Sequence, residues 1–289
     1  MIIVKLIGGL GNQIFQYALG RNLAEKNKAE LKLDVSGFET YKKHKYSLNH
    51  FNIIENIATA QEVSRYKKYD AQTKIGKLFN LIESLKPLKS RTYIKEPHYY
   101  GYFPKILNLK GGIYLDGFWQ SEKYFKDIEN ILRDEFTIKE KLEDNLLNAI
   151  ISTNSVSIHV RRTDYVTNPG ANKIHGVCGL DYYNNAIVKI TNLVKTPHFF
   201  VFSDDIEWSK NNIKINFPIT FVEHGADKNY EDLTLMSLCK HNIIANSSFS
   251  WWGAWLNNNP NKIVIAPKKW LNNNKIDKRR MVIESWIKI

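Results

Sequence analysis

The chain has 289 residues, of which 43% are hydrophobic and 12% aromatic. This is enough apolar material for a large core, and it excludes a disordered protein. The formal net charge of +12 suits an anionic partner, which can be nucleic acid, an anionic lipid surface or a phosphorylated substrate. Two cysteines, Cys178 and Cys239, cannot form a disulfide framework and are expected to be reduced core residues of a cytosolic protein.

The first half of the chain alternates strand and helix. The expected elements are a strand over Ile2 to Ile7, a glycine-rich turn over Gly8 to Asn12, an amphipathic helix over Gln13 to Lys28 and a strand over Leu31 to Val35. Residues 37–95 are polar and irregular, apart from a helix near Ile75 to Leu85. The half is completed by a strand over Ile113 to Phe118, a helix that begins with Ser121 as N-cap and runs to Phe136, and a helix over Leu142 to Ile151.

The second half repeats the alternation. The strands are expected at Val156 to Val160, Phe199 to Phe202, Ile219 to Val222, Asn242 to Ala245 and Ile263 to Ala266, with helices at Leu180 to Leu193 and Asp232 to Lys240. Strands that alternate with helices predict a parallel sheet covered on both faces. The sequence therefore predicts an α/β protein of two Rossmann-like domains, 1–150 and 151–289. The last segment, Lys278 to Ile289, is expected to form a helix that packs back on the first half.

Basic and aromatic residues are interleaved in four clusters. They lie at Tyr41 to Tyr46, Tyr66 to Tyr69, Lys268 to Trp270 and Lys278 to Arg280. Each cluster alone is typical of a solvated face, but together they predict contact with a membrane surface or an anionic glycolipid. The N-terminus lacks the features of a signal peptide, and no apolar run approaches the roughly 18 residues of a membrane span.

The glycine-rich turn after the first strand reads GGLGN. Gly9 and Gly11 fit a dinucleotide-binding fingerprint loosely, but its third glycine position holds Ile14, and no P-loop lysine is present. Neither NAD nor ATP is supported. Two interpretations remain equally open: a close approach of the backbone to a ligand, and a tight turn without a ligand.

Two adjacent arginines follow the buried strand of the second half, in the segment SIHVRRTDY (Ser157 to Tyr165). In open α/β sheets, ligands bind at the carboxyl ends of the strands. Arg161 and Arg162 are therefore placed to bind a ligand, and two guanidinium groups suit a pyrophosphate better than a single carboxylate. The alternative is that both arginines pair with surface acids.

The next strand, in FFVFSDD, ends in Asp204 and Asp205. These carboxylates can cap the following helix, accept hydrogen bonds from the N–H groups of a base such as guanine, or bind a metal. Capping is expected to account for one of them. A metal is the least favoured choice, because no further acid or histidine stands nearby at a ligand-like spacing.

The segment NSSFSWW (Asn246 to Trp252) follows a third strand and opens an apolar helix. Hydroxyl and backbone N–H groups at a helix start form an anion site, so Ser247, Ser248 and Ser250 are expected to face phosphate or sugar. The tryptophans at 251, 252 and 255 are expected to pack in the core. Together, the three strand ends supply the groups needed for one nucleoside diphosphate.

Five segments resemble glycosyltransferase family 11, the α-1,2-fucosyltransferases. They are GGLGNQIFQYA (Gly8 to Ala18), LDGFWQSEKYF (Leu115 to Phe125), HVRRTDY (His159 to Tyr165), FSDD (Phe202 to Asp205) and NSSFSWWGAWL (Asn246 to Leu256). They span nearly the whole chain in the right order, and Tyr41 to Tyr100 is the part least similar to the family.

The resemblance implies a GT-B-type fold, with the active site in the cleft between the two domains. The N-terminal domain would take the acceptor and the C-terminal domain the GDP-sugar. It also implies inverting transfer of L-fucose from GDP-β-L-fucose to the 2-hydroxyl of a terminal β-galactose, on an oligosaccharide or a lipid-linked glycan such as lipopolysaccharide. No cofactor, no metal and no nucleic acid are expected, and a bacterial-type enzyme would work in the cytoplasm, peripherally on the inner face of the membrane.

Matched residue by residue, the resemblance implies that Arg161 and Arg162 bind the diphosphate and that His159 lies near the nucleotide. Asp204 or Asp205 would recognise guanine, and Ser248, Phe249 and Ser250 would contact phosphate or fucose. In related protein fucosyltransferases a GNQ segment faces the donor sugar, which places Asn12, with Gly9 and Gly11, at the donor. Asp164 is a candidate base or an orienting group for the arginines, and Asp116 is a second candidate base.

Three other functions are consistent with parts of the sequence. One is a transferase for another GDP-sugar or a non-galactose acceptor, and another is a sugar-binding module without turnover. A basic nucleic-acid-binding protein would explain the charge and the interleaved aromatic residues. It would leave the arginines, aspartates and serines at the strand ends without a role.

Overall fold

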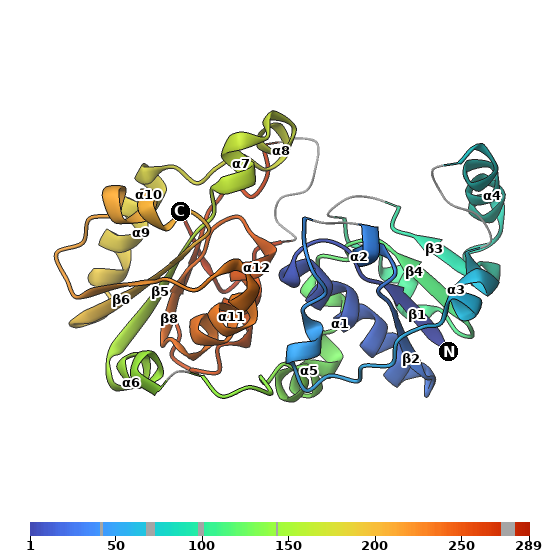
Figure 1. The fold of residues 1–289 in the computed structure, drawn as a ribbon, viewed down its shortest axis with the longest axis horizontal. Coiled ribbons are helices and arrows are strands. Elements are labelled where there is room, and N and C mark those ends of the chain that lie inside the picture. The colour runs from blue at the N-terminus through green and yellow to red at the C-terminus, as the bar shows by residue number, and fades with distance from the viewer. Residues whose placement is uncertain (41–42, 68–72, 98–100, 143, 273–280) are drawn as a thin grey trace. The chain divides into compact units, whose positions relative to one another are not determined.

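The computed structural model describes residues 1–40, 43–67, 73–97, 101–142, 144–272 and 281–289. The chain divides into two compact units, Met1–Phe136 and Thr137–Ile289, each built around a parallel sheet (Figure 1). This confirms the predicted α/β class. The division lies before the predicted boundary at 150, because helix α6 (Asp144–Ser152) packs against elements of the second unit.

Unit 1 holds a four-stranded sheet in the order β2-β1-β4-β3, with every pair parallel. Its strands are β1 (Ile2–Lys5), β2 (Leu31–Asp34), β3 (Tyr93–Lys95) and β4 (Ile113–Asp116). Helix α1 (Leu10–Asn27) covers one face, and its Gly20 lies directly against Val4 and Leu31. Helix α3 (Ala60–Tyr66) covers the other face. The structure thus adds β3 to the predicted strands.

The helix predicted from Ser121 is broken. Two 3₁₀ turns, Glu122–Tyr124 and Lys126–Ile128, precede α5 (Glu129–Glu135), and the side chain of Ser121 makes no capping hydrogen bond. Phe125 has φ −142°, outside the helical region, and its buried ring packs 6.0 Å from the ring of Phe15. Packing of Phe125 in the core therefore overrides the local helix preference. Unit 1 is completed by α2 (Gly37–Thr40), α4 (Lys74–Leu85) and 3₁₀ turns at Leu48–His50, Leu88–Ser90 and Pro104–Asn108.

Unit 2 holds a six-stranded parallel sheet in the order β10-β9-β8-β5-β6-β7. The strands are β5 (Asn154–Val160), β6 (Pro197–Ser203), β7 (Ile219–Val222), β8 (His241–Ile243), β9 (Val264–Ala266) and β10 (Ile287–Lys288). This is the doubly wound order, in which the chain reverses its direction of travel between β5 and β8. Ligands of such sheets bind outside the carboxyl ends of the strands at this switch point.

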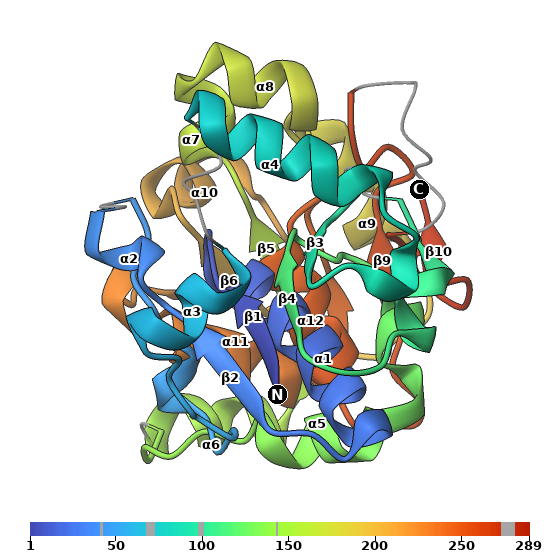
Figure 2. The ribbon, with the colours of Figure 1, turned by 90° about the vertical axis from the view of Figure 1, so that its right-hand side faces the viewer.

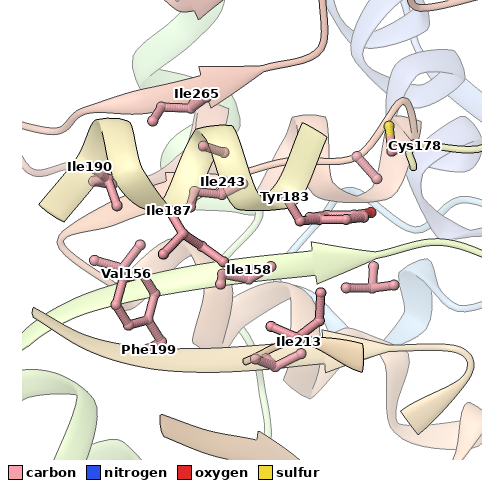
Figure 3. Packing of buried hydrophobic residues seen from close by; sticks show 14 of the residues in the cluster. Val156, Ile158, Cys178, Tyr183, Ile187, Ile190, Phe199, Ile213, Ile243 and Ile265 are labelled. Atoms are coloured by element: carbon pink, nitrogen blue, oxygen red, sulfur yellow. The ribbon is translucent and has the colours of Figure 1, made fainter. Parts of the chain in front are cut away.

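Alternate residues of β5 face opposite layers. Val156, Ile158 and Val160 pack with Tyr183 and other residues of α9 (Leu180–Thr191) in one hydrophobic cluster (Figure 3). On the opposite face, Ser157 accepts a hydrogen bond of 2.8 Å from Asn242. Two further helices of this unit are α11 (Asn229–Leu238) and α12 (Ser248–Leu256). The three tryptophans of α12 are at most 2% exposed, which confirms their predicted place in the core.

The end of the chain differs from the prediction. Residues Met281 to Ile289 contain no helix, and β10 instead pairs in parallel with β9 in the sheet of unit 2. The reason is that a short apolar segment can complete an open sheet edge by backbone hydrogen bonds. The basic cluster at 278–280, with 41–42 and 68–69 of two other clusters, lies outside the described residues. Both cysteines are buried and free, as predicted.

Candidate functional site

The pairing register of β5 and β6 places the paired arginines beside the paired aspartates. Val160 lies opposite Ser203 at the end of this parallel ladder. The residues that follow on the two strands therefore meet at the carboxyl edge of the sheet. Helix α7 (Thr163–Thr167) begins directly after the arginines, and α10 (Ile206–Asn212) begins directly after the aspartates.

Asp204 organises the end of β5. Its carboxylate oxygens accept hydrogen bonds from the backbone N–H of Arg162 at 2.8 Å and from the hydroxyl of Thr163 at 2.5 Å. The same carboxylate lies 3.0 Å from Nη1 of Arg161. Asp204 thus accepts from two side chains and one backbone amide of the arginine segment, and it fixes the direction in which that segment leaves the sheet.

The guanidinium group of Arg162 is held on two sides. It lies 3.8 Å above the ring of Trp208, which is a cation–π distance, and its Nε lies 3.4 Å from Asp205. Arg161 lies 5.4 Å from the ring of Tyr165. Stacking against an aromatic ring leaves the edge of a guanidinium fork available for a bidentate partner. Both arginines do pair with acids, as the alternative interpretation expected, but these acids stand at the neighbouring strand end of the same edge.

Asp205 is the N-cap of α10. Its Oδ1 accepts from the backbone N–H of Trp208 at 3.2 Å, which confirms that capping accounts for one of the two carboxylates. Among the described residues its second oxygen contacts only Nε of Arg162, at 3.4 Å, and its side chain is 37% exposed against 20% for Asp204. Asp205 therefore keeps more acceptor capacity for a ligand than Asp204 does.

His159 lies below the arginines and is 4% exposed. Its ring centroid lies 5.4 Å from that of Phe249 in the first turn of α12, and its buried Nδ1 has no hydrogen-bond partner among the described residues. Burial, helped by the positive charge of Arg161, lowers the pKa of His159 to about 4, although Asp204 opposes this shift. The imidazole is therefore neutral at pH 7.

The start of α12 lies across the switch point from the arginines. Ser247 is its N-cap and accepts from the backbone N–H of Phe249 at 3.3 Å. Ser248 and Phe249 are partly exposed, whereas Ser250 is 1% exposed and its hydroxyl donates to the carbonyls of Ala245 and Ser247. The hydroxyl of Ser250 therefore makes hydrogen bonds within the start of the helix. Of the residues expected to contact a ligand in this segment, only Ser248 and Phe249 are accessible to solvent.

In unit 1 the glycine-rich turn follows β1, which lies between β2 and β4 in the sheet. The turn is shorter than predicted, because α1 begins at Leu10 with Gly9 as N-cap and Gly11 lies in its buried first turn. Gly8 has φ +78°, and a Cβ there would lie 2.7 Å from Nδ2 of Asn12, so a glycine is required. Oδ1 of Asn12 accepts a hydrogen bond of 2.6 Å from Gln120, which follows β4.

Glu96 holds the segment that carries Gln120. Its carboxylate accepts from the backbone N–H of Phe118 at 2.7 Å and of Trp119 at 3.2 Å. Trp119 has φ +55°, a conformation that is strained for a bulky residue. Burial, with a smaller contribution from the negative charge of Asp116, raises the pKa of Glu96 to about 7, although the two backbone hydrogen bonds lower it.

We expect the stability of Glu96→Gln relative to the parent protein to increase with pH. Because the pKa of Glu96 is raised on folding, its contribution to stability is complete below pH 4.5 and is lost as the pH rises through about 7. The free energy of unfolding, measured in urea, is compared between the variant and the parent protein. The difference between them should rise in favour of the variant by up to about 3 kcal/mol from pH 5 to pH 8.

A matched control is Glu62→Gln. A hydrogen bond from Lys32 lowers the pKa of Glu62 to about 2, so this carboxylate stays charged from pH 5 to pH 8. The control should show no such change, and an equal difference between Glu96→Gln and the parent at both pH values would contradict the role of burial.

The two candidate bases differ in what the structure shows. Asp116, at the end of β4, accepts from Lys5 at 3.2 Å and from the hydroxyl of Tyr93 at 2.5 Å. It is 9% exposed, so its carboxylate serves an internal ion pair. Asp164 lies in α7, and its side chain is outside the described part of the structure. Among the described residues, no group of three or more His, Cys, Asp or Glu side chains is placed so that it could hold a metal ion.

Sequence reasoning missed four residues that organise these strand ends: Thr163, Trp208, Glu96 and Gln120. Trp208 is an aromatic residue in the first turn after a capping aspartate, and this position could have suggested a partner for the arginines. Glu96 follows β3, a three-residue strand in a region that looked irregular. Without β3, nothing in the sequence indicated that Glu96 stands beside the end of β4.

Comparison with known proteins relates the whole chain to one family. The model of "Glycosyl transferase family 11" matches residues 1–289. Alpha-1,2-colitosyltransferase of Escherichia coli is 37% identical over 297 residues, which cover 100% of this chain and 99% of that protein. The O-antigen biosynthesis glycosyltransferase WbnK of Escherichia coli is 36% identical over 98% of this chain and 99% of its own. Human galactoside alpha-(1,2)-fucosyltransferase 1 is 28% identical over 49% of this chain and 42% of that protein.

Two solved structures share the fold. Fucosyltransferase NodZ from Bradyrhizobium superposes with a TM-score of 0.51 at 14% identity, over 87% of this chain and 91% of that one. A mutant of Arabidopsis thaliana FUT1 in complex with GDP superposes with a TM-score of 0.50 at 10% identity, over 95% and 72%.

Proposed function

This chain belongs to glycosyl transferase family 11 and is a glycosyltransferase, and we propose that it transfers L-fucose from GDP-β-L-fucose to the 2-hydroxyl of a terminal β-galactose. The proposed transfer inverts the fucose carbon and needs no metal ion. The observation that carries the proposal is the pair Arg161 and Arg162 at the end of β5, oriented by the carboxylates at the end of β6. The two fucosyltransferase folds support a GT-B-type assignment of the two units.

Unit 2 is the proposed nucleotide-binding unit. Its switch point brings the arginines and the N-terminus of α12 to the same edge of the sheet. Guanidinium forks and helix-start N–H groups both bind phosphate oxygens. Asp205, which keeps a freer carboxylate oxygen, is the proposed acceptor for the N–H edge of guanine, and Asp204 is the proposed positioning residue for the arginines. In unit 1, Asn12 is proposed to face the donor sugar.

The reaction breaks the bond between the fucose carbon and the β-phosphate oxygen. Negative charge grows on the departing GDP, and arginines that are already oriented stabilise it without reorganisation. The acceptor oxygen attacks the opposite face of the sugar, forms the new glycosidic bond and gives up its proton to solvent water. His159, neutral at pH 7, adds no positive charge of its own beside the arginines.

We expect that neither candidate acid is an essential base. The ion pair of Asp116 with Lys5 occupies its carboxylate, and the reactive sugar cation needs little help from a base. Both Asp116→Asn and Asp164→Asn should therefore keep kcat within about tenfold of the parent, whereas loss of a general base costs about 10²–10⁴. Turnover at saturating donor and acceptor measures this, and a hundredfold loss in one variant would identify that residue as the base.

The test of the donor and the linkage is transfer from GDP-fucose to lactose and N-acetyllactosamine in EDTA, with the product linkage read by NMR. An α-1,2-fucosyl galactose supports donor, linkage and metal independence together. If GDP binds tightly but no product forms, the proposed nucleotide-binding site is still supported, and GDP-fucose with these two acceptors is excluded as the substrate pair. Absence of both would overturn the proposal.

A second donor is favoured by the 37% identity to a colitosyltransferase over the whole chain. Colitose is the 3-deoxy analogue of fucose, so the two donors present the same diphosphate and differ by one hydroxyl group. The ratio of kcat/KM for the two GDP-sugars decides between them. The relative named for O-antigen biosynthesis supports, in the same way, a glycan of the cell surface as acceptor.

A further inference from the structure

Helix α4 of unit 1 exposes most of its large apolar side chains to solvent. A surface helix of a globular protein normally turns such residues toward the core. In α4 the exposed fractions are at least one half for five large side chains: Ile75 61%, Leu78 58%, Leu81 56%, Ile82 50% and Leu85 78%. Figures 1 and 2 both show α4 at the periphery of its unit, beside β3 and far from α1.

The helix is attached to the protein by its other side. Among the described residues of α4, Gly76 and Glu83 are buried, and they lie two turns apart on one face. Thr73 caps the N-terminus by accepting from the N–H of Gly76 at 3.0 Å, and Arg91 donates to the carbonyls of Ser84 and Lys86 at the other end. Capping and polar contacts hold both ends of the helix. Phe79 is partly buried and makes a further contact, and the five side chains named above remain exposed among the described residues.

The surroundings of this face are basic. Residues 73–91 contain five basic residues, Lys74, Lys77, Lys86, Lys89 and Arg91, and the single acid is Glu83. Glu83 is 3% exposed and paired with Lys86, so it offsets the charge of that lysine and leaves the other four basic residues without an acid in this segment. An apolar stripe with lysines beside it is the pattern of a helix that lies in a membrane interface.

We propose that α4 docks this protein on an anionic lipid bilayer, with the five apolar side chains inserted between lipids and the lysines at the headgroups. A helix of 12 residues is too short to cross a bilayer, and none of the described helices is both long and apolar enough to do so. Basic residues near an anionic surface strengthen such binding. This surface goes beyond the proposed function and depends on neither its donor nor its acceptor.

A second copy of the chain is a poorer occupant for this face. In a symmetric contact the same patch meets itself, so the lysines of one α4 would approach those of the other. Like charges brought together across an interface oppose association. Anionic lipids instead neutralise these lysines while they accept the apolar side chains.

The experiment is co-sedimentation of the full chain with vesicles. We expect binding to phosphatidylethanolamine–phosphatidylglycerol vesicles, with weaker binding to phosphatidylcholine vesicles and at high salt. The double variant Leu78→Glu/Leu85→Glu should lower the partition coefficient at least about tenfold, and each of Lys74→Gln and Lys77→Gln about fivefold. The matched control is Val188→Glu, which makes the same kind of change at a residue of α9 that is 60% exposed, and it should bind as the parent does.

Thermal unfolding of each variant shows that the fold is retained. The proposal is overturned if the parent chain does not bind anionic vesicles, or if the double glutamate variant binds them as the parent does. It is also overturned if the chain does not sediment with the vesicles and instead forms a dimer that the double glutamate variant dissociates. The partner of the apolar face of α4 is then a second copy of the chain.

Discussion

Replacing Arg162 with alanine is expected to lower kcat/KM for sugar transfer by about two to three orders of magnitude while the protein stays folded. Loss of one oriented donor at a developing negative charge costs on the order of 3 kcal/mol of transition-state stabilisation. The guanidinium is positioned for this role by the ring of Trp208 at 3.8 Å and by Asp205. The backbone N–H of residue 162, which donates to Asp204, remains in the alanine variant, so the end of β5 keeps its shape.

The lysine variant separates charge from geometry. Arg162→Lys keeps the positive charge but loses the planar fork and the stacking on Trp208, so most of the activity should still be lost. The control is Arg133→Ala, which removes a partly buried arginine of α5 that pairs with Glu129 in unit 1 and not at the strand ends of unit 2, and it should leave kcat/KM unchanged. Initial rates and GDP affinity measure the effect, and near-normal turnover in Arg162→Ala would rule out its role.

Substitutions of the two adjacent aspartates are expected to have different effects on activity and on recognition of the base. Asp204→Asn should lower kcat/KM about ten- to a hundredfold, because its carboxylate accepts from Arg161, Arg162 and Thr163 at once. This loss concerns the arginines, so it should be the same for a guanosine and an inosine diphosphate sugar. Inosine lacks the 2-amino group of guanine and therefore tests recognition of the base alone.

Asp205→Asn should instead reduce the preference for guanosine over inosine. Asparagine caps a helix as well as aspartate does, so α10 and the fold are retained. The variant loses the negative charge beside both N–H groups of guanine and the charge that faces Nε of Arg162, so any loss of kcat/KM through Arg162 should be the same for both nucleotides and only the preference reports on the base. Competition between the two nucleotides measures the preference, and a loss of selectivity in Asp204→Asn with none in Asp205→Asn would exchange the two roles.

Much of the fold was predictable because its strands are short buried runs. Apolar residues at alternate positions mark β5, a nearly continuous apolar run marks β6, and turn or charged residues follow both strands. The helix from Ser121 and the C-terminal helix were wrong for a shared reason: Phe125 is placed by its contact with Phe15, and β10 is placed by its pairing with β9. Neither partner is near in the sequence, so local preference could not show either one.

The candidate site likewise has features that local sequence predicts and features that depend on contacts across the fold. Local sequence placed arginines, aspartates and serines directly after buried strands, and that position alone indicates a ligand edge in a parallel sheet. It could not indicate that Ser250 turns inward or that Glu96 lies beneath the turn at Trp119, since both depend on contacts across the fold.

The amino-acid sequence alone determined three things about this protein. These are the residue types at the strand ends, the hydrophobic pattern that buries the strands, and the family motifs. The arginines pair with aspartates that lie 42 or 43 residues further along the chain. This pairing required the register between β5 and β6, which sets Val160 against Ser203. Register is a property of two strands together, because it follows from how both bury their side chains against α9 and the opposite layer. The exposed apolar face of α4 is likewise decided by the side on which the helix attaches, which its amphipathic pattern does not specify.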